Sequence, residues 1–275
     1  MLRTLLSVGI VAGIMGIYMW TRSANRKAGG KSSGVGLSEC GSCGDASCGS
    51  SETDKVAVNS DKKYDGIFFD LDGTLIDSCR DLTDALNYAA EGLIGRKLTA
   101  EEVKPKLGFG MIKLVESILP EGSDEEVIQR TYSLFTEYYN EHKGSNTYSY
   151  EGIKPLLEEL KAEGYKLAVV TNKDGDIARP LVNDFFSGIF DVIVGRSKVL
   201  NKKPDPGMMR FAMSAAGVSP EKVLYIGDSE VDKEFALASG TDYLLVSWGF
   251  RKKEDMEKIA EGRLIEKAKE VYNFI

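Results

Sequence analysis

Two carboxylates stand one residue apart in this chain, at Asp70 and Asp72, just before Gly73 and Thr74. They follow the apolar run at residues 66–69, which predicts a short buried strand. Paired acids are costly to desolvate unless a cation or a proton partner is present, and Mg²⁺ prefers such hard oxygen ligands. One carboxylate could then act as a nucleophile toward phosphorus while the other moves the proton. The alternative interpretation is a strand that leads into an Asp-Gly turn.

Hydrogen-bond donors follow the next apolar run. Residues 166–170 predict a second strand, and Thr171 and Asn172 come directly after it. Their hydroxyl and amide groups can meet a phosphoryl oxygen. Further on, Lys203 precedes Pro204, whose ring stiffens the backbone. A fixed ammonium beside carboxylates can offset charge at a phosphoryl site, although a lone lysine is more often at the surface.

A second pair of acids ends another predicted strand. Asp228 follows the apolar run at residues 223–227, and Asp232 lies four residues further on. Asp228 is expected to cap the next helix, and Asp232 is expected on the first turn of that helix, facing the same way. Capping alone could explain both acids. Beside Asp70 and Asp72 they would instead supply the missing metal ligand.

A regular alternation of predicted strands and helices would position these candidate residues. Strands are predicted at residues 66–69, 166–170, 191–194, 223–227 and 242–246. Helices are predicted at residues 151–163, 177–186 and 207–216, and two more helices are expected to close the chain. Such alternation implies an α/β fold, a doubly wound parallel sheet with a Rossmann-like core, and it brings the candidate residues to the carboxyl edge of that sheet.

The segment at residues 80–147 differs because it predicts only helices, between the first and second strands. We expect it to form an all-helical cap on a core made of residues 62–79 and 148–275, with hinges near Ser78 and Gly144. Residues 107–113 are the candidate cap loop. Gly110 would allow close backbone approach to a substrate, and Lys113 could meet an anionic group, although a solvated lysine is the alternative.

Four motifs of this sequence together resemble those of the haloacid-dehalogenase-like superfamily of phosphohydrolases, and the resemblance extends over residues 64–251. The motifs are Asp70-Leu-Asp72-Gly-Thr, Thr171-Asn172, Lys203-Pro and Gly227-Asp228-Ser-Glu-Val-Asp232. Within the superfamily, the strings Asp-Ser-Cys-Arg-Asp-Leu at 77–82, Leu-Gly-Phe-Gly at 107–110 and Thr-Asn-Lys at 171–173 resemble phosphoglycolate phosphatases. The charged segment after Arg251 departs from that pattern.

The resemblance implies a role for the residues of each motif. Asp70 would be the nucleophile that becomes an aspartyl-phosphate, and Asp72 would protonate the leaving alcohol and then activate water. Thr171 would bind the phosphoryl group, which Lys203 would neutralise. The cofactor would be Mg²⁺, held by the Asp70 carboxylate, the Asp72 backbone carbonyl and the Asp228 carboxylate, with Asp232 in a supporting position. The expected substrate is a small phosphorylated metabolite, above all 2-phosphoglycolate.

Charge is unevenly distributed along the 275 residues. The net charge is −7, yet the first 31 residues carry five basic residues and no acid, so the rest carries −12. An acidic body argues against a nucleic acid partner.

The first 61 residues predict an anchor and a tether. Residues 5–20 form an uncharged, largely apolar run that ends in Trp20, and basic residues follow, so we expect a single membrane span at residues 2–21 with the catalytic domain facing the cytoplasm. A cleaved signal peptide is the alternative. Residues 22–61 are rich in Gly and Ser and predict a flexible linker. Its Cys40, Cys43 and Cys48 could bind a soft metal or could be solvated thiols. This composition resembles short Cys-rich membrane proteins that accompany bacterial ferrous-iron transporters.

Three other functions stay open on these grounds. A pyrophosphatase or a sugar-phosphate mutase could use the same core, and a mutase would want an acid or base on the cap. The only histidine, His142, lies near a hinge. A further alternative is a metal-binding or docking membrane protein in which the phosphatase-like body is an accessory domain.

Overall fold

The computed structural model of the protein describes residues 62–275. The predicted anchor at residues 2–21, the linker at 22–61 and the three cysteines of the linker lie outside the described residues. Between residues 62 and 275 no helix is both long and apolar enough to cross a membrane.

The core is a six-stranded parallel sheet with the order β5-β4-β1-β6-β7-β8. Its strands are β1 (Gly66–Phe69), β4 (Lys166–Asp174), β5 (Val192–Arg196), β6 (Val223–Gly227), β7 (Asp242–Val246) and β8 (Leu264–Ile265). The chain builds one half of the sheet outward from β1, then crosses back to build the other half from β6. This is a doubly wound sheet, so the predicted fold class is confirmed, and the order reverses between β1 and β6.

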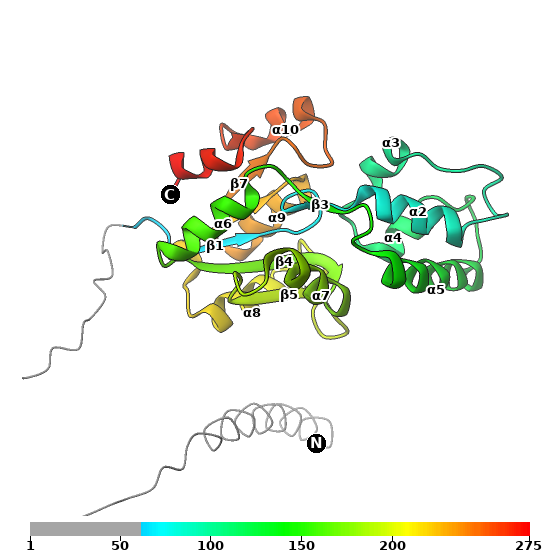
Figure 1. The fold of residues 1–275 in the computed structure, drawn as a ribbon, viewed down its shortest axis with the longest axis horizontal. Coiled ribbons are helices and arrows are strands. Elements are labelled where there is room, and N and C mark those ends of the chain that lie inside the picture. Colours follow the sequence, from blue (N-terminus) through cyan, green and yellow to red (C-terminus); the bar gives the residue numbers. More distant parts are fainter. Residues whose placement is uncertain (1–61) are drawn as a thin grey trace, which may run out of the picture. The chain divides into compact units, whose positions relative to one another are not determined.

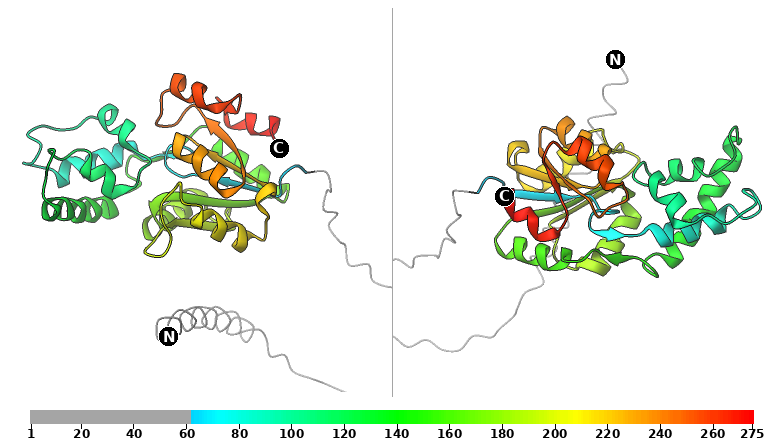
Figure 2. Two further views of the ribbon diagram at one scale, coloured as in Figure 1. Left: turned by 180° about the vertical axis from the view of Figure 1, so that it is seen from behind. Right: turned by 90° about the horizontal axis from the view of Figure 1, so that it is seen from above.

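Helices cover both faces of the sheet, as Figures 1 and 2 show. They are α6 (Ile153–Ala162), α7 (Gly175–Phe186), α8 (Gly207–Ala216), α9 (Glu230–Ser239), α10 (Lys253–Ala260), η2 (Pro220–Lys222) and η3 (Ala268–Asn273). Side chains of a strand alternate between the two faces of the sheet, so β1 contributes side chains to the apolar layer on each face. Ile67 and Phe69 pack in one apolar cluster with α6 and α7, and Phe68 packs in the other with α8 and α9. A strand that is buried on both faces needs the continuous apolar run seen in the sequence.

The cap consists of the helices between β2 (Ile76–Asp77) and β3 (Tyr148–Ser149). They are α2 (Cys79–Ala89), α3 (Ala100–Val103), η1 (Lys104–Lys106), α4 (Met111–Glu116) and α5 (Glu125–His142). They enclose an apolar cluster of their own, which includes Leu86 and Phe135 and which two core residues, Ile177 and Phe250, also join. The cap lies at the end of the sheet toward which β1 runs (Figure 1). The cap therefore faces the edge where the sequence places its candidate residues.

Two chain segments connect the cap to the core, and the short antiparallel pair of β2 with β3 ties them together. One buried side chain adds to this connection. The Asp81 carboxylate at the start of α2 accepts hydrogen bonds from the backbone N–H groups of Gly144, Asn146 and Thr147 in the returning segment. Both predicted hinge regions are thus linked through one carboxylate.

Several local predictions are wrong in detail. The second strand extends to Asp174, so Thr171 and Asn172 lie inside the strand rather than follow it. The last segment forms α10, the edge strand β8 and the short η3 instead of two helices. Ser229, and not Asp228, is the N-cap of α9, because its side chain accepts from the N–H of Asp232.

Candidate active site

Asp70 lies where the order of the sheet reverses. It follows the last residue of β1, and its backbone N–H donates to the carbonyl of Ile226 on the neighbouring β6 at 2.9 Å. This pairing brings Asp70 beside Asp228, which follows β6. The crevice at such a switch point is where ligands bind in open α/β sheets.

Lys203 brings a buried ammonium to this point. Its Nζ lies 2.8 Å from Asp70 Oδ1 and 2.7 Å from Asp232 Oδ1, and its side chain is only 2% exposed. The Tyr225 hydroxyl, 3.1 Å from Nζ, completes the surroundings. Burial lowers the pKa of Lys203, but the Asp232 and Asp70 carboxylates outweigh burial and raise the pKa above its ordinary value. Lys203 is therefore a fixed positive charge.

Asp232 differs from the other acids because its oxygens are already occupied. Oδ1 accepts from Lys203 and from Tyr225 at 3.3 Å, and Oδ2 accepts from the N–H groups of Asp228 and Ser229 and from the Ser229 hydroxyl. Asp232 thus orients Lys203 and the β6–α9 turn. Among the three clustered acids, Asp70 and Asp228 keep the freer oxygen atoms.

The backbone closes tightly around Asp228. A Cβ atom placed on Gly73 would lie 2.3 Å from Asp228 Oδ2, and one placed on Gly249 would lie 2.3 Å from Asp228 Cβ. Gly73 also has φ +89°, where side chains are disfavoured. Asp228 Oδ2 accepts one hydrogen bond, from the N–H of Phe250 at 2.7 Å. Only glycines leave room for the carboxylate in this place.

Three carboxylates with one ammonium leave an excess of buried negative charge, and oxygen atoms of Asp70, Asp228 and Asp232 lie within 4.8 Å of one another. Burial raises the pKa of Asp70 to about 6 although Lys203 opposes it, and burial with the Asp232 and Asp70 charges raises the pKa of Asp228 to about 8. Asp70 Oδ1 is buried and has no hydrogen-bond partner beyond its ion pair with Lys203. A hard divalent cation would offset this charge, so the donor set fits Mg²⁺.

Asp72 is held from two sides. Both of its carboxylate oxygens lie 3.0 Å from Lys173 Nζ, and Oδ1 also accepts from the Ser78 hydroxyl at 2.5 Å. Lys173 is buried, and its ammonium lies 4.8 Å from the ring centre of Tyr139 on α5. Burial lowers the pKa of Lys173, but Asp72 and Tyr139 outweigh it and raise the pKa. Sequence reasoning missed this residue, although a lysine at the end of an apolar strand is a signal that it lies inside.

Thr171 and Asn172 lie near the end of β4, at the same edge of the sheet. Thr171 is buried, and its Oγ1 accepts from the N–H of Lys173 at 3.2 Å. Asn172 connects two other elements, because its Oδ1 accepts from the N–H of Lys203 at 2.6 Å and its Nδ2 donates to the carbonyl of Gly108 at 2.9 Å. The Asn172 amide therefore holds both the loop that carries Lys203 and the cap loop that carries Gly108.

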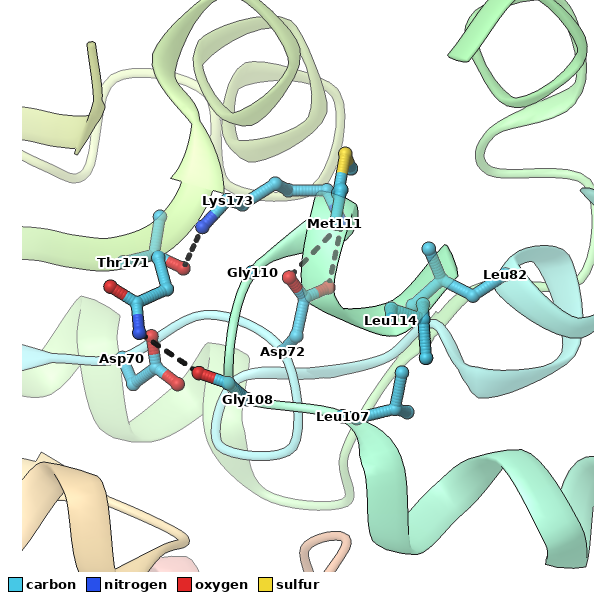
Figure 3. A pocket seen from close by; sticks show the side chains of 11 residues that line it. Asp70, Asp72, Leu82, Leu107, Gly108, Gly110, Met111, Leu114, Thr171 and Lys173 are labelled. Atoms are coloured by element: carbon cyan, nitrogen blue, oxygen red, sulfur yellow. Dashed lines mark hydrogen bonds and ion pairs between the residues drawn. The ribbon is translucent and has the colours of Figure 1, made fainter. Parts of the chain in front are cut away.

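A cavity separates these core residues from the cap, as Figure 3 shows. Leu82, Leu107, Gly108, Gly110, Met111 and Leu114 line it from the cap, and Asp70, Asp72, Thr171, Asn172 and Lys173 line it from the core. Gly110 thus takes the predicted place. Lys113 does not, because its ammonium pairs with Glu116 at 2.5 Å, is half-exposed and borders a different hollow. The contact of Lys113 with a substrate stays a prediction, which its position outside this cavity does not support.

The fold and site define a capped α/β enzyme with acids and a lysine at a sheet switch point. The family model described as haloacid dehalogenase-like hydrolase matches residues 67–246, and the chain belongs to this family. The family covers the core strands up to β7 together with the whole cap.

Individual relatives of this chain within the family are phosphatases or proposed phosphatases. The chain is 36% identical over 187 residues to a phosphoglycolate phosphatase of Aquifex aeolicus, which covers 68% of this chain and 86% of the relative. Among solved structures, a proposed phosphoglycolate phosphatase of Lactobacillus delbrueckii superposes with a TM-score of 0.71 at 33% identity, over 76% of this chain and 97% of that one. CbbY of Rhodobacter sphaeroides, solved with phosphate, gives 0.65 at 25% identity, over 76% and 96%. The protein is thus a hydrolase with phosphatase relatives.

Proposed function

We propose that the protein is a Mg²⁺-dependent phosphomonoester hydrolase that acts through an aspartyl-phosphate, with 2-phosphoglycolate as the favoured substrate. The observation that carries the proposal is Asp70, buried at the switch point, 2.8 Å from a fixed ammonium and facing a capped cavity. A carboxylate in that position can reach a phosphorus atom that Lys203 and Thr171 contact from the side.

In the first half of the reaction, Asp70 forms a bond to phosphorus and the bond from phosphorus to the leaving oxygen breaks. Asp72 gives its proton to that oxygen, so the product leaves as an alcohol. Lys203 offsets charge on the phosphoryl oxygens, and Thr171 donates its hydroxyl to one of them. Mg²⁺, held by Asp70, Asp228 and the Asp72 carbonyl, would supply positive charge against the same oxygens.

In the second half, Asp72 takes a proton from a water molecule that attacks the phosphorus of the aspartyl-phosphate. The bond between phosphorus and the Asp70 oxygen breaks, and inorganic phosphate is released. The two contacts from Lys173 and Ser78 keep Asp72 turned toward the cavity for both proton transfers.

The cavity wall supports a small substrate. The cap contributes apolar side chains and glycine backbone to it, and Lys173 is the cation among its lining residues in the described part of the chain. A substrate carboxylate next to the leaving oxygen would approach that lysine. The names of the relatives agree with this choice of substrate.

The other activities on this core are less well supported. A mutase needs an acid or base on the cap, and none of the cap residues that line the cavity in the described region has an ionisable side chain. His142 is exposed, and its ring stacks on Tyr138 with centroids 4.0 Å apart. A pyrophosphatase would need cations for a second phosphoryl group, and among the described lining residues Lys173 alone could provide one.

The test is phosphate release by the full-length protein from 2-phosphoglycolate, a panel of other phosphomonoesters and pyrophosphate, with and without Mg²⁺. Strong preference for 2-phosphoglycolate that requires Mg²⁺ would support the proposal. Preference for pyrophosphate would replace the substrate, and no release from any compound would refute the hydrolase assignment.

The membrane anchor at residues 2–21 is also part of the proposal, with the catalytic domain on the cytoplasmic side. Extraction of the protein from membranes by carbonate would contradict it, whereas extraction only by detergent would support it. Zinc or iron binding that is lost when Cys40, Cys43 and Cys48 become Ser would favour the additional metal-binding function.

A further inference from the structure

The cap loop at residues 107–110 is fastened to the core by its backbone carbonyls. Three successive carbonyl oxygens each accept a hydrogen bond from a core side chain, and the three donors come from three different core loops or strand ends. The contacts are Arg251 Nη2 to Leu107 O (3.1 Å), Asn172 Nδ2 to Gly108 O (2.9 Å) and Lys202 Nζ to Phe109 O (3.5 Å). The loop is thus docked residue by residue on the core.

Arg251 makes the most extensive of these contacts. Its guanidinium pairs with Glu230 through Nε at 2.9 Å and Nη2 at 3.1 Å, and its side chain is only 13% exposed. The same group lies 5.4 Å from the ring centre of Phe109, within the range of a cation–π contact. Gly108 has φ +99°, a conformation that favours glycine, so its residue type supports the shape of the loop. Arg251 therefore contacts both the backbone and a side chain of the loop.

Each of the three donors lies next in sequence to a residue of the proposed active site or to a residue that contacts it. Asn172 follows Thr171, and Lys202 precedes Lys203. Arg251 follows Phe250, whose N–H donates to Asp228. A shift of the cap loop would therefore act on the loops that hold the phosphoryl site.

The cavity between cap and core is small and partly open to solvent. Its free volume is about 40 Å³, which is room for a few water molecules. Movement of the loop at 107–110 away from the core would widen the cavity for a larger substrate. The contacts to the loop carbonyls would then break and form again.

We propose that Arg251 is the positioning residue that fastens the cap loop over the active site, and that it acts through residues 107–110 rather than on the substrate. Asn172 lines the cavity and can contact the substrate itself, and Lys202 is exposed with a contact at the upper limit of a hydrogen bond. Arg251 is mostly shielded from solvent, is held by its own carboxylate partner and does not line the cavity.

The test compares Arg251→Met with Arg263→Met in the full-length protein. Arg263 is a matched control because it also has an aspartate (Asp242, 3.5 Å), a carbonyl (Tyr243, 3.3 Å) and an aromatic ring (5.5 Å) as partners, all within the core. Amide hydrogen exchange of Leu107 and Leu114, whose N–H groups donate to the carbonyls of Lys104 (3.3 Å) and Gly110 (3.1 Å), reports on opening of the loop without any need for substrate. Phosphate release at several substrate concentrations reports on kcat and KM.

We expect exchange at Leu107 and Leu114 to rise about tenfold in Arg251→Met, and kcat/KM to fall by a similar factor, while Arg263→Met changes neither. Unchanged exchange at both amides would overturn the proposal. The kinetic part depends on the proposed function, but faster exchange with no phosphate release by the wild type would support the fastening role and refute only the hydrolase. If Arg251→Met fails to fold, Glu230→Gln should give the same changes in smaller size, and no change there would also overturn the proposal.

Discussion

Two groups of buried carboxylates in this protein have opposite surroundings. Asp81, at the base of the cap, is 3% exposed and accepts five hydrogen bonds, from Gly144, Asn146 and Thr147. Asp70 and Asp228, at the sheet edge, are buried just as deeply, but Asp70 has only an ion pair and Asp228 a single hydrogen bond. The first group is satisfied by the protein itself, and the second group is not.

The difference separates architecture from chemistry. Donors from the backbone and from short side chains let Asp81 link two chain segments without any further partner. At the sheet edge only Asp70 pairs with the Lys203 ammonium, and Asp228 accepts one backbone hydrogen bond, so these acids retain the capacity to take a cation and to attack an electrophile. Burial of an acid alone does not identify an active site. What identifies it is burial combined with unmet demand for positive charge.

Asp70→Asn should have the largest effect. The amide cannot act as the nucleophile, so we expect phosphate release to fall by at least about a thousandfold, while the folded structure is kept because one of the mutually repelling charges is removed. Steady-state phosphate release and circular dichroism would check this. Substantial Mg²⁺-dependent turnover in the variant would sink the assignment of Asp70 as nucleophile.

Lys173→Met tests Asp72, whose surroundings are intermediate between those of Asp81 and those of Asp70, because one lysine and one hydroxyl contact its carboxylate. Loss of a charged hydrogen bond worth about 2–3 kcal/mol should lower kcat/KM by roughly 30- to 160-fold. Lys166→Met, on the exposed start of the same strand, is the matched control and should keep full activity. Equal activity in both variants would contradict a role for Lys173 at the site.

Asp81→Asn should reduce stability more than chemistry. The amide turns one acceptor into a donor that faces N–H and O–H groups of the hinge, which should lower the free energy of unfolding by about 2–3 kcal/mol. Urea unfolding would measure this, with Asp84→Asn as the control, because Asp84 makes only an exposed pair with Arg80 and should change stability by less than about 0.5 kcal/mol. Similar losses in the two variants would show that the hinge carboxylate has no special weight.

Adding Mg²⁺ should stabilise the sheet-edge acids and leave the hinge unaffected. At a concentration one hundred times its dissociation constant, a ligand of the folded state adds about 2.7 kcal/mol, or several degrees in Tm. Thermal unfolding with EDTA and with Mg²⁺ would show the gain. Asp228→Asn should lose most of it and Asp81→Asn should keep it, so an equal gain in Asp228→Asn would place the metal elsewhere.

Local sequence pattern is enough to specify the sheet and the set of residues at its edge. Strand β1 lies at residues 66–69 and strand β7 at residues 242–246, as predicted, because a strand buried on both faces requires an uninterrupted apolar run. Parallel strands end at one edge, so the order of the motifs along the chain already predicts that Asp70, Lys203 and Asp228 meet. These features follow from residue pattern and from topology.

The contacts between residues far apart in the chain, by contrast, depend on tertiary packing. Lys173 reaches Asp72 across 101 residues of sequence, Gly144 reaches Asp81 across 63, and Arg251 reaches Leu107 across 144. Lys113 instead pairs with Glu116 and does not line the cavity. The direction in which a cap side chain points depends on how the helices pack on one another and on the sheet. That packing joins residues far apart in the chain, and no local pattern of residue types specifies such a pairing.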